Sequence, residues 1–178
     1  MTGTSTGDGL RLERRFLLPS LPRPLTQGRV ALVEERYLTG TGLTLRRTMS
    51  AGTPPALTLG QQVRAASDRT ARATLTESLP EDTYAELARL PADVLVWRRY
   101  DVLLTGRPVA VHVFEGELHG LVLVQAEFAG RAEAGLFPPP VYAVAEVTAD
   151  ARFCGPALAR TGSGQLVRLV AEYGMLLR

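Results

Sequence analysis

Alternation of polar and apolar residues with a period of two is the feature that most constrains the fold of this chain. In the segment LRLERRFLL at residues 10–18, Arg11, Glu13 and Arg15 fall on one side of an extended backbone. Similar strand-like segments are predicted near residues 10–18, 29–38, 42–49, 57–64, 71–77, 94–104, 108–114, 120–128 and 142–148. Many short strands separated by Gly- and Pro-containing turns are typical of an antiparallel sheet that closes or nearly closes.

Two further segments predict helices. Ser78 and Glu81 have the spacing of a capping box, and Pro80 falls in the first turn, where a missing N–H costs little. The tail from Ser163 to Leu177 is amphipathic, and it either packs on the sheet or covers it as a lid. We therefore predict an α+β fold that is mainly an antiparallel, closed or nearly closed eight-stranded β-barrel with a few flanking helices. Residues 1–9 are predicted to be disordered, and residues 10–178 to form a single domain.

Composition excludes several classes of function. No apolar run approaches the roughly 20 residues that a membrane helix needs, so no membrane association is predicted. A single cysteine, Cys154, suits a reducing compartment, and a cytoplasmic location is predicted. The formal net charge of +2 gives no strong signal for nucleic-acid binding. All 20 basic residues are arginines, whose planar guanidinium binds carboxylate and phosphate groups through paired hydrogen bonds.

Nearly every predicted strand has one polar face, and this pattern allows two architectures. Thr44, Arg46 and Thr48 alternate with leucines on one strand, and Gln125 and Glu127 alternate with apolar residues on another. These faces point either to solvent or into the lumen of a barrel. Small barrels are usually filled by apolar side chains, so the residues alone favour the solvent-facing arrangement without excluding the other.

Three stretches, taken together, resemble the CYTH family of triphosphate tunnel enzymes. They are LERRFLL at the start, FEGELHGLVLVQAEF at residues 114–128 and AEVTADARFCGPALA at residues 145–159. RYL, LRR, LTL and RRY lie between them in the family's order, so the resemblance covers about residues 10–160. It implies an eight-stranded tunnel in which basic residues hold a triphosphate and glutamates hold Mg²⁺ or Mn²⁺. The resemblance also favours polar faces that line the tunnel over polar faces that point to solvent.

Only some of the functional residues of the CYTH family are present at the matching positions of this chain. Glu13 matches the second glutamate of the opening motif, Arg15 takes the place of its lysine, and Glu127 matches the late glutamate. Carboxylates of the family pattern are replaced here by Arg11, Thr74, Thr76, His112 and Gln125. The resemblance and the strand faces together predict an anion site formed by Arg11, Arg15, Arg46, Arg64, Arg72 and Arg99. The resemblance also implies a metal site with Glu13 and Glu127 as ligands.

The direction of these departures predicts the function. Six arginines beside two glutamates would give the tunnel a charge of about +4, which attracts anions and suits hard divalent cations poorly. We therefore expect a divergent tunnel protein that binds a triphosphate, nucleotide or polyphosphate, with weakened or lost metal-dependent hydrolysis. One alternative is an active Mg²⁺- or Mn²⁺-dependent triphosphatase or adenylate cyclase-like enzyme. Another is a non-catalytic scaffold.

Overall fold

The computed structural model describes residues 11–22, 29–64, 71–104 and 106–177, with side chains except at residues 11, 62–64 and 71–75. Its strands are β1 (Arg11–Leu18), β2 (Arg29–Leu38), β3 (Leu43–Ser50), β4 (Ala56–Arg64), β5 (Ala71–Ser78), β6 (Ala92–Leu104), β7 (Arg107–Phe114), β8 (Val122–Phe128) and β9 (Ala145–Glu146). Its helices are α1 (Glu81–Leu87), η2 (Gly116–Leu118), α2 (Arg131–Leu136), η3 (Ala151–Phe153), α3 (Gly155–Leu158) and α4 (Ser163–Ala171). The predicted disorder of residues 1–9 lies outside the described residues.

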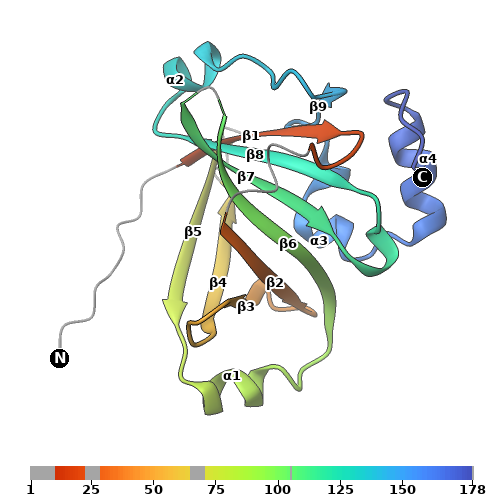
Figure 1. Cartoon of the computed structure of the whole chain (residues 1–178). Helices are drawn as coiled ribbons and strands as arrows, with labels where there is room; N and C mark the ends of the chain where they lie inside the picture. The colour runs from red at the N-terminus through yellow and green to blue at the C-terminus, as the bar shows by residue number, and fades with distance from the viewer. Residues whose placement is uncertain (1–10, 23–28, 65–70, 105, 178) are drawn as a thin grey trace.

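The strands form one antiparallel sheet in the order β5-β4-β3-β2-β6-β7-β8-β1-β9. The predicted α+β class and antiparallel pairing are confirmed, but the sheet has nine strands rather than eight. Strand β9, which has only two residues and pairs with β1, lies within the strand-like segment predicted near residues 142–148. Among the described residues, β1 also pairs with β5 at Arg11↔Arg72 and Leu12↔Ala71. Figure 1 shows the two groups of strands crossing, with β1, β7 and β8 above β2 to β5.

One face of the sheet, called the inner face below, has an apolar part and a polar part. Leu17 of β1, Val33 of β2 and Trp97 of β6 are buried there in one hydrophobic cluster. Leu166 and Val170 of α4 join the same cluster. The C-terminal helices therefore cover the apolar part of the inner face, where they lie beside one end of β7 and β8 (Figure 1).

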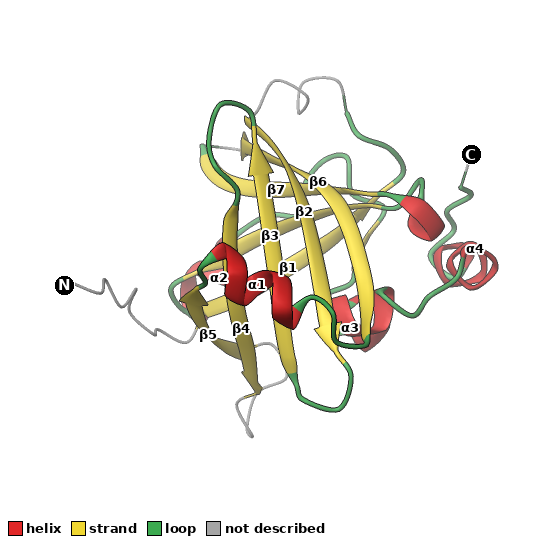
Figure 2. Cartoon of the chain, turned by 90° about the horizontal axis from the view of Figure 1, so that it is seen from below, coloured by secondary structure: helices red, strands yellow, loops and turns green. Residues whose placement is uncertain are grey.

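The opposite, outer face is covered in two places. The segment from α2 to Phe137 packs over Phe16 and Phe128 of β1 and β8. Tyr84 of α1 is buried against Leu38 and Leu45 of β2 and β3, and Figure 2 shows α1 lying across these strands. Apolar side chains on the outer face are thus buried without occupying the inner face.

The helix predictions need two corrections. Ser78 belongs to β5 and does not cap α1, whose N-cap is Pro80, without a side-chain hydrogen bond. The tail helix ends at Ala171, and Gly174 beyond it has a φ of 74°, which suits glycine. Because Leu166, Leu169 and Val170 are buried, the tail is packed on the sheet. No helix in the described ranges is long and apolar enough to cross a membrane.

A close approach at Gly155 joins α3 to β2. A Cβ atom on Gly155 would overlap the Tyr37 hydroxyl and lie 2.8 Å from its Cζ atom. The Tyr37 hydroxyl also donates a hydrogen bond to Glu35 Oε2. Any side chain at position 155 therefore displaces this phenol from the glutamate.

We predict that Gly155→Ala lowers the free energy of unfolding by about 1–3 kcal/mol, the usual cost of overpacking a core. The matched control is Gly164→Ala in α4, where a Cβ meets nothing within 4 Å. That change should be neutral or slightly stabilising because alanine favours helix. Urea unfolding of both variants measures the difference. Equal stabilities would contradict the predicted contact.

Candidate functional site

The polar part of the inner face gathers charged residues from five strands. Antiparallel register partners project to the same face, so the pairs Glu35↔Arg46, Arg99↔His112 and Arg15↔Gln125 place their side chains together. The described charged residues of this face are Glu13, Arg15, Arg29, Glu35, Arg46, Arg99, Asp101 and Glu127, and His112 and Gln125 lie among them. We call Arg15, Arg46 and Arg99 the inner arginine cluster.

Arg46 is held by a buried carboxylate. Glu35 is only 6% exposed, yet it accepts hydrogen bonds from Arg46 Nε, at 2.7 Å, and Nη2, and from the Tyr37 hydroxyl. Burial and the adjacent charge of Glu35 raise the pKa of Tyr37, so the phenol keeps its proton. Burial disfavours the Arg46 cation, but the charge of Glu35 leaves the pKa of Arg46 raised. About half of the Arg46 side chain, 49%, remains exposed and within reach of a ligand.

The other two arginines of the cluster are also fixed by carboxylates. Arg15 is buried, lies 3.2 Å from Glu13 Oε1, and donates to the backbone carbonyl of Phe153 in η3. Arg99 Nε lies 2.8 Å from Asp101 Oδ1, in a pair that is partly exposed. Each guanidinium of the cluster is therefore oriented before any ligand arrives.

His112 lies among these arginines. It is directly opposite Arg99 on the neighbouring strand, and its ring centroid is 5.5 Å from that of Trp97. Its Nε2 atom is sealed from solvent and has no hydrogen-bond partner among the described residues. Burial, followed by the positive charges of Arg99, Arg46 and Arg15, lowers the pKa of His112 to about 3. The imidazole is neutral at physiological pH.

The remaining predicted residues lie at the β1–β5, β4–β5 and β1–β8 pairings. Backbone register pairs Arg72 with both Arg11 and Arg64, although the side chains of all three lie outside those described. Glu13 is directly opposite Glu127. The backbone thus brings the predicted anion residues to neighbouring rungs, and their roles as ligands stay predictions.

Two acidic residues of this face escaped the sequence analysis. Glu35 precedes the RYL motif, and its alternation with Val33 and Tyr37 could have placed it inside. Asp101 follows Arg99 by two residues, which is the same-face spacing of a strand. Because both carboxylates neutralise arginines of the cluster, the positive excess of this face is smaller than the predicted value of about +4.

The described side chains do not make a complete metal site. They contain no group of three His, Cys, Asp or Glu residues that could hold an ion. Glu13 and Glu127 are adjacent in register, but Glu13 already interacts with Arg15. Mg²⁺ can bind through one or two carboxylates when phosphate oxygens complete its coordination shell. These two glutamates fit a metal only in that ligand-dependent way.

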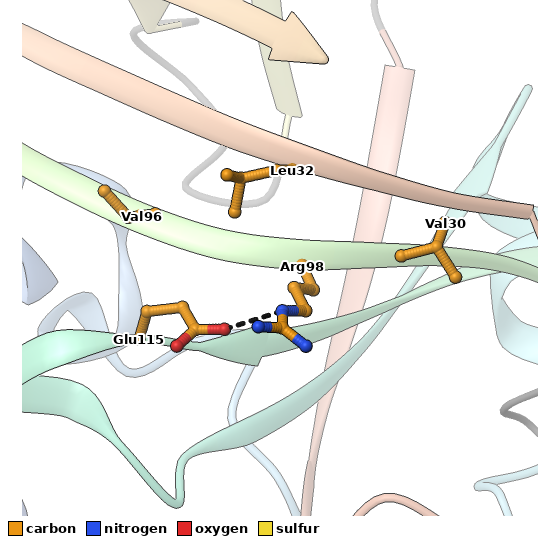
Figure 3. Close-up of a pocket in the computed structure, with 5 residues that line it drawn as sticks. All are labelled: Val30, Leu32, Val96, Arg98 and Glu115. Atoms are coloured by element: carbon orange, nitrogen blue, oxygen red, sulfur yellow. Dashed lines mark ion pairs between the residues drawn. The ribbon is translucent and has the colours of Figure 1, made fainter. Parts of the chain in front are cut away.

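A separate pocket of about 500 Å³ lies on the outer face of β2 and β6. Figure 3 shows its lining, with Val30, Leu32 and Val96 around the ion pair between Arg98 and Glu115. The Arg98 Nε atom lies 2.8 Å from Glu115 Oε1, the same separation as in the Arg99–Asp101 pair. Arg98 and Arg99 are thus matched neighbours on opposite faces of one strand.

We predict that His112 makes folding pH-dependent. Because its folded pKa of about 3 lies below the ordinary value of 6.5, the unfolded chain binds more protons between these values. Stability should therefore fall by up to about 1.4 kcal/mol per pH unit as pH drops from 6.5 toward 5. His112→Phe should flatten this dependence, whereas exposed His119→Gln should retain it. Urea titrations at pH 7, 6 and 5 test this, and an equal slope in His112→Phe would contradict it.

Comparisons with known proteins identify solved structures that are similar to this one. No protein-family model matches the chain, and no curated protein matches it significantly. Two solved structures of NE1496, one described as an inorganic triphosphatase and the other as a hypothetical protein, are each 26% identical to it. They cover 85% of this chain and 95% and 99% of their own, with TM-scores of 0.56 and 0.57. The PH1012 protein from Pyrococcus horikoshii OT3 is 13% identical, covering 71% of this chain and 84% of its own, with a TM-score of 0.47.

The agreement with NE1496 extends over most of both chains and includes sequence identity as well as fold. The resemblance of this chain to the CYTH family, predicted from three short stretches of its sequence, is confirmed.

Proposed function

We propose that this protein binds a triphosphate or another phosphorylated polyanion on the inner face of its sheet. The observation that carries the proposal is the convergence of Arg15, Arg46 and Arg99, from three different strands, around one neutral histidine. Guanidinium groups bind phosphate oxygens through charge-assisted, paired hydrogen bonds. The similarity to a protein described as an inorganic triphosphatase supports the same class of ligand.

The proposal includes closure of the sheet into a tunnel. The pairing of β5 with β1 supports it, because β5 and β1 lie near opposite ends of the strand order. In a closed tunnel, Arg11, Arg64 and Arg72 would stand on neighbouring rungs beside the cluster. A polyanion longer than a single phosphate would then contact arginines along its length.

Ordering of the arginines before binding favours affinity. Glu35 holds Nε and Nη2 of Arg46, and Asp101 holds Nε of Arg99. The ligand therefore does not have to restrict these long side chains, which saves part of the entropy that binding usually costs. The same carboxylates repel an anion, so the site should favour ligands with several charges over single phosphates.

Hydrolysis is proposed to be weak or lost. Phosphoryl transfer relies on metal ions and positioned charge to stabilise the transition state. Family carboxylate positions carry Arg11, Thr74, Thr76, His112 and Gln125 here, which leaves Glu13 and Glu127 as proposed metal ligands. An active metal-dependent triphosphatase remains the second candidate because the similarity to NE1496 favours it.

A cytoplasmic location stays a prediction.

The variants Arg99→Gln and Arg98→Gln each remove one ion pair from strand β6, and the two ion pairs have the same length. Tripolyphosphate without metal should raise the melting temperature of the wild type and of Arg98→Gln by mass action. In Arg99→Gln the affinity should fall by about tenfold, the typical loss of one charge-assisted hydrogen bond. The wild-type shift should also weaken with added salt. Equal shifts in both variants would contradict an inner-face site.

Catalytic turnover of tripolyphosphate is expected to be slow. With Mg²⁺ or Mn²⁺ present, we expect little phosphate release from tripolyphosphate, measured under conditions in which thermal shift shows that the ligand is bound. Rapid release that disappears in Glu13→Gln and Glu127→Gln would instead establish the active triphosphatase. Arg98→Gln serves as the control for unspecific loss of activity.

A further inference from the structure

We propose that His112 takes up a proton from solvent when a polyanion occupies the inner arginine cluster, so that the site binds its anion together with a proton. This rests on the proposed function, because it assigns a role within the same site. It names a further residue that determines affinity and makes that affinity depend on pH.

The position of the ring supports this role. His112 projects from β7 onto the inner face, opposite Arg99 of β6. Trp97 and Phe114 contact the ring from the apolar side, with centroid distances of 5.5 Å and 6.4 Å. Its Nε2 atom is buried without a hydrogen-bond partner among the described residues. A packed imidazole with an unsatisfied nitrogen is a group whose charge state is set by its electrostatic surroundings.

Those surroundings are the same arginines that would hold the ligand. Arg99, Arg46 and Arg15 all act on His112 and, together with burial, keep it neutral in the free protein. A polyanion bound to these guanidiniums cancels their positive potential and adds a negative one. Proton and anion then stabilise each other's binding, and thermodynamic linkage makes the effect reciprocal. No direct contact between ligand and ring is required because charges act over several ångströms.

Other titratable groups face His112, and they must be distinguished from it. The described charged groups of this face are Glu13 and Arg15 of β1, Arg29 and Glu35 of β2, Arg46 of β3, Arg99 and Asp101 of β6, and Glu127 of β8. Proton uptake is assigned to His112 by comparing His112→Phe with His119→Gln, because the chain contains only two histidines.

The test uses sulfate, because it keeps its charge between pH 5 and 8, and tripolyphosphate as a stronger second probe. Histidine ring signals of the wild-type protein are followed by NMR at pH 6, with and without each anion. We expect the His112 imidazole, which is the imidazole that remains in His119→Gln, to change from neutral to cationic shifts as the anion binds. Calorimetry in two buffers of different ionisation enthalpy should then report proton uptake on binding.

The affinity for sulfate should tighten as pH falls, by up to tenfold per pH unit between pH 7 and 5. In His112→Phe, which keeps an aromatic ring against Trp97, the affinity should not change with pH. His119→Gln is the matched control, because His119 lies exposed in the turn before β8, and it should behave as the wild type. If His112→Phe fails to fold, the NMR measurement on the wild type still decides.

The outcomes separate the two proposals. Anion binding that shifts thermal stability while the His112 imidazole stays neutral would overturn the role of His112 and leave the proposed function intact. The same holds if His112→Phe keeps the wild-type pH dependence. Absence of binding by either anion at pH 7 and pH 5 would overturn both.

Discussion

The buried carboxylate of Glu35 is the group on which the organisation of the inner face depends. A charge with 6% exposure is stable only when it is paired and hydrogen-bonded, and Arg46 and Tyr37 both satisfy it. Tyr37 reaches it because Gly155 leaves room for the phenol at the start of α3. One carboxylate thereby links two strands of the sheet to the C-terminal segment and orients an arginine toward the site.

The inner face combines apolar residues, which form part of the core, with polar residues, which form the candidate site. Leu17, Trp97 and Phe114 bury themselves under α3 and α4 and provide much of the core. Along the same strands, Arg15, Arg99 and His112 replace apolar residues with charge or potential charge. A barrel interior filled throughout with apolar side chains could not bind an anion. The polar residues are tolerated because each guanidinium of the cluster is matched by a carboxylate.

Acidic residues therefore have two effects here. Glu35 and Asp101 lower the charge of the face, but they also fix the arginines in place. Glu13 and Glu127, opposite each other on β1 and β8, are the pair that could support a metal with a phosphate ligand. The chemistry of the site depends on whether Glu13 serves Arg15 or an ion, since one carboxylate oxygen cannot fully satisfy both.

The sequence by itself determined the strands and the polar face of each strand on which Arg15, Arg46 and Arg99 lie, because alternation with a period of two fixes the side of each residue. Whether those polar faces point inward was left open by the residues alone. The sequence also determined the family resemblance. Only the tertiary structure decided that Glu35 neutralises Arg46 and that His112 is neutral, because both depend on burial and on charges brought from separate strands. It also decided the length of the tail helix, which depends on packing rather than on local pattern.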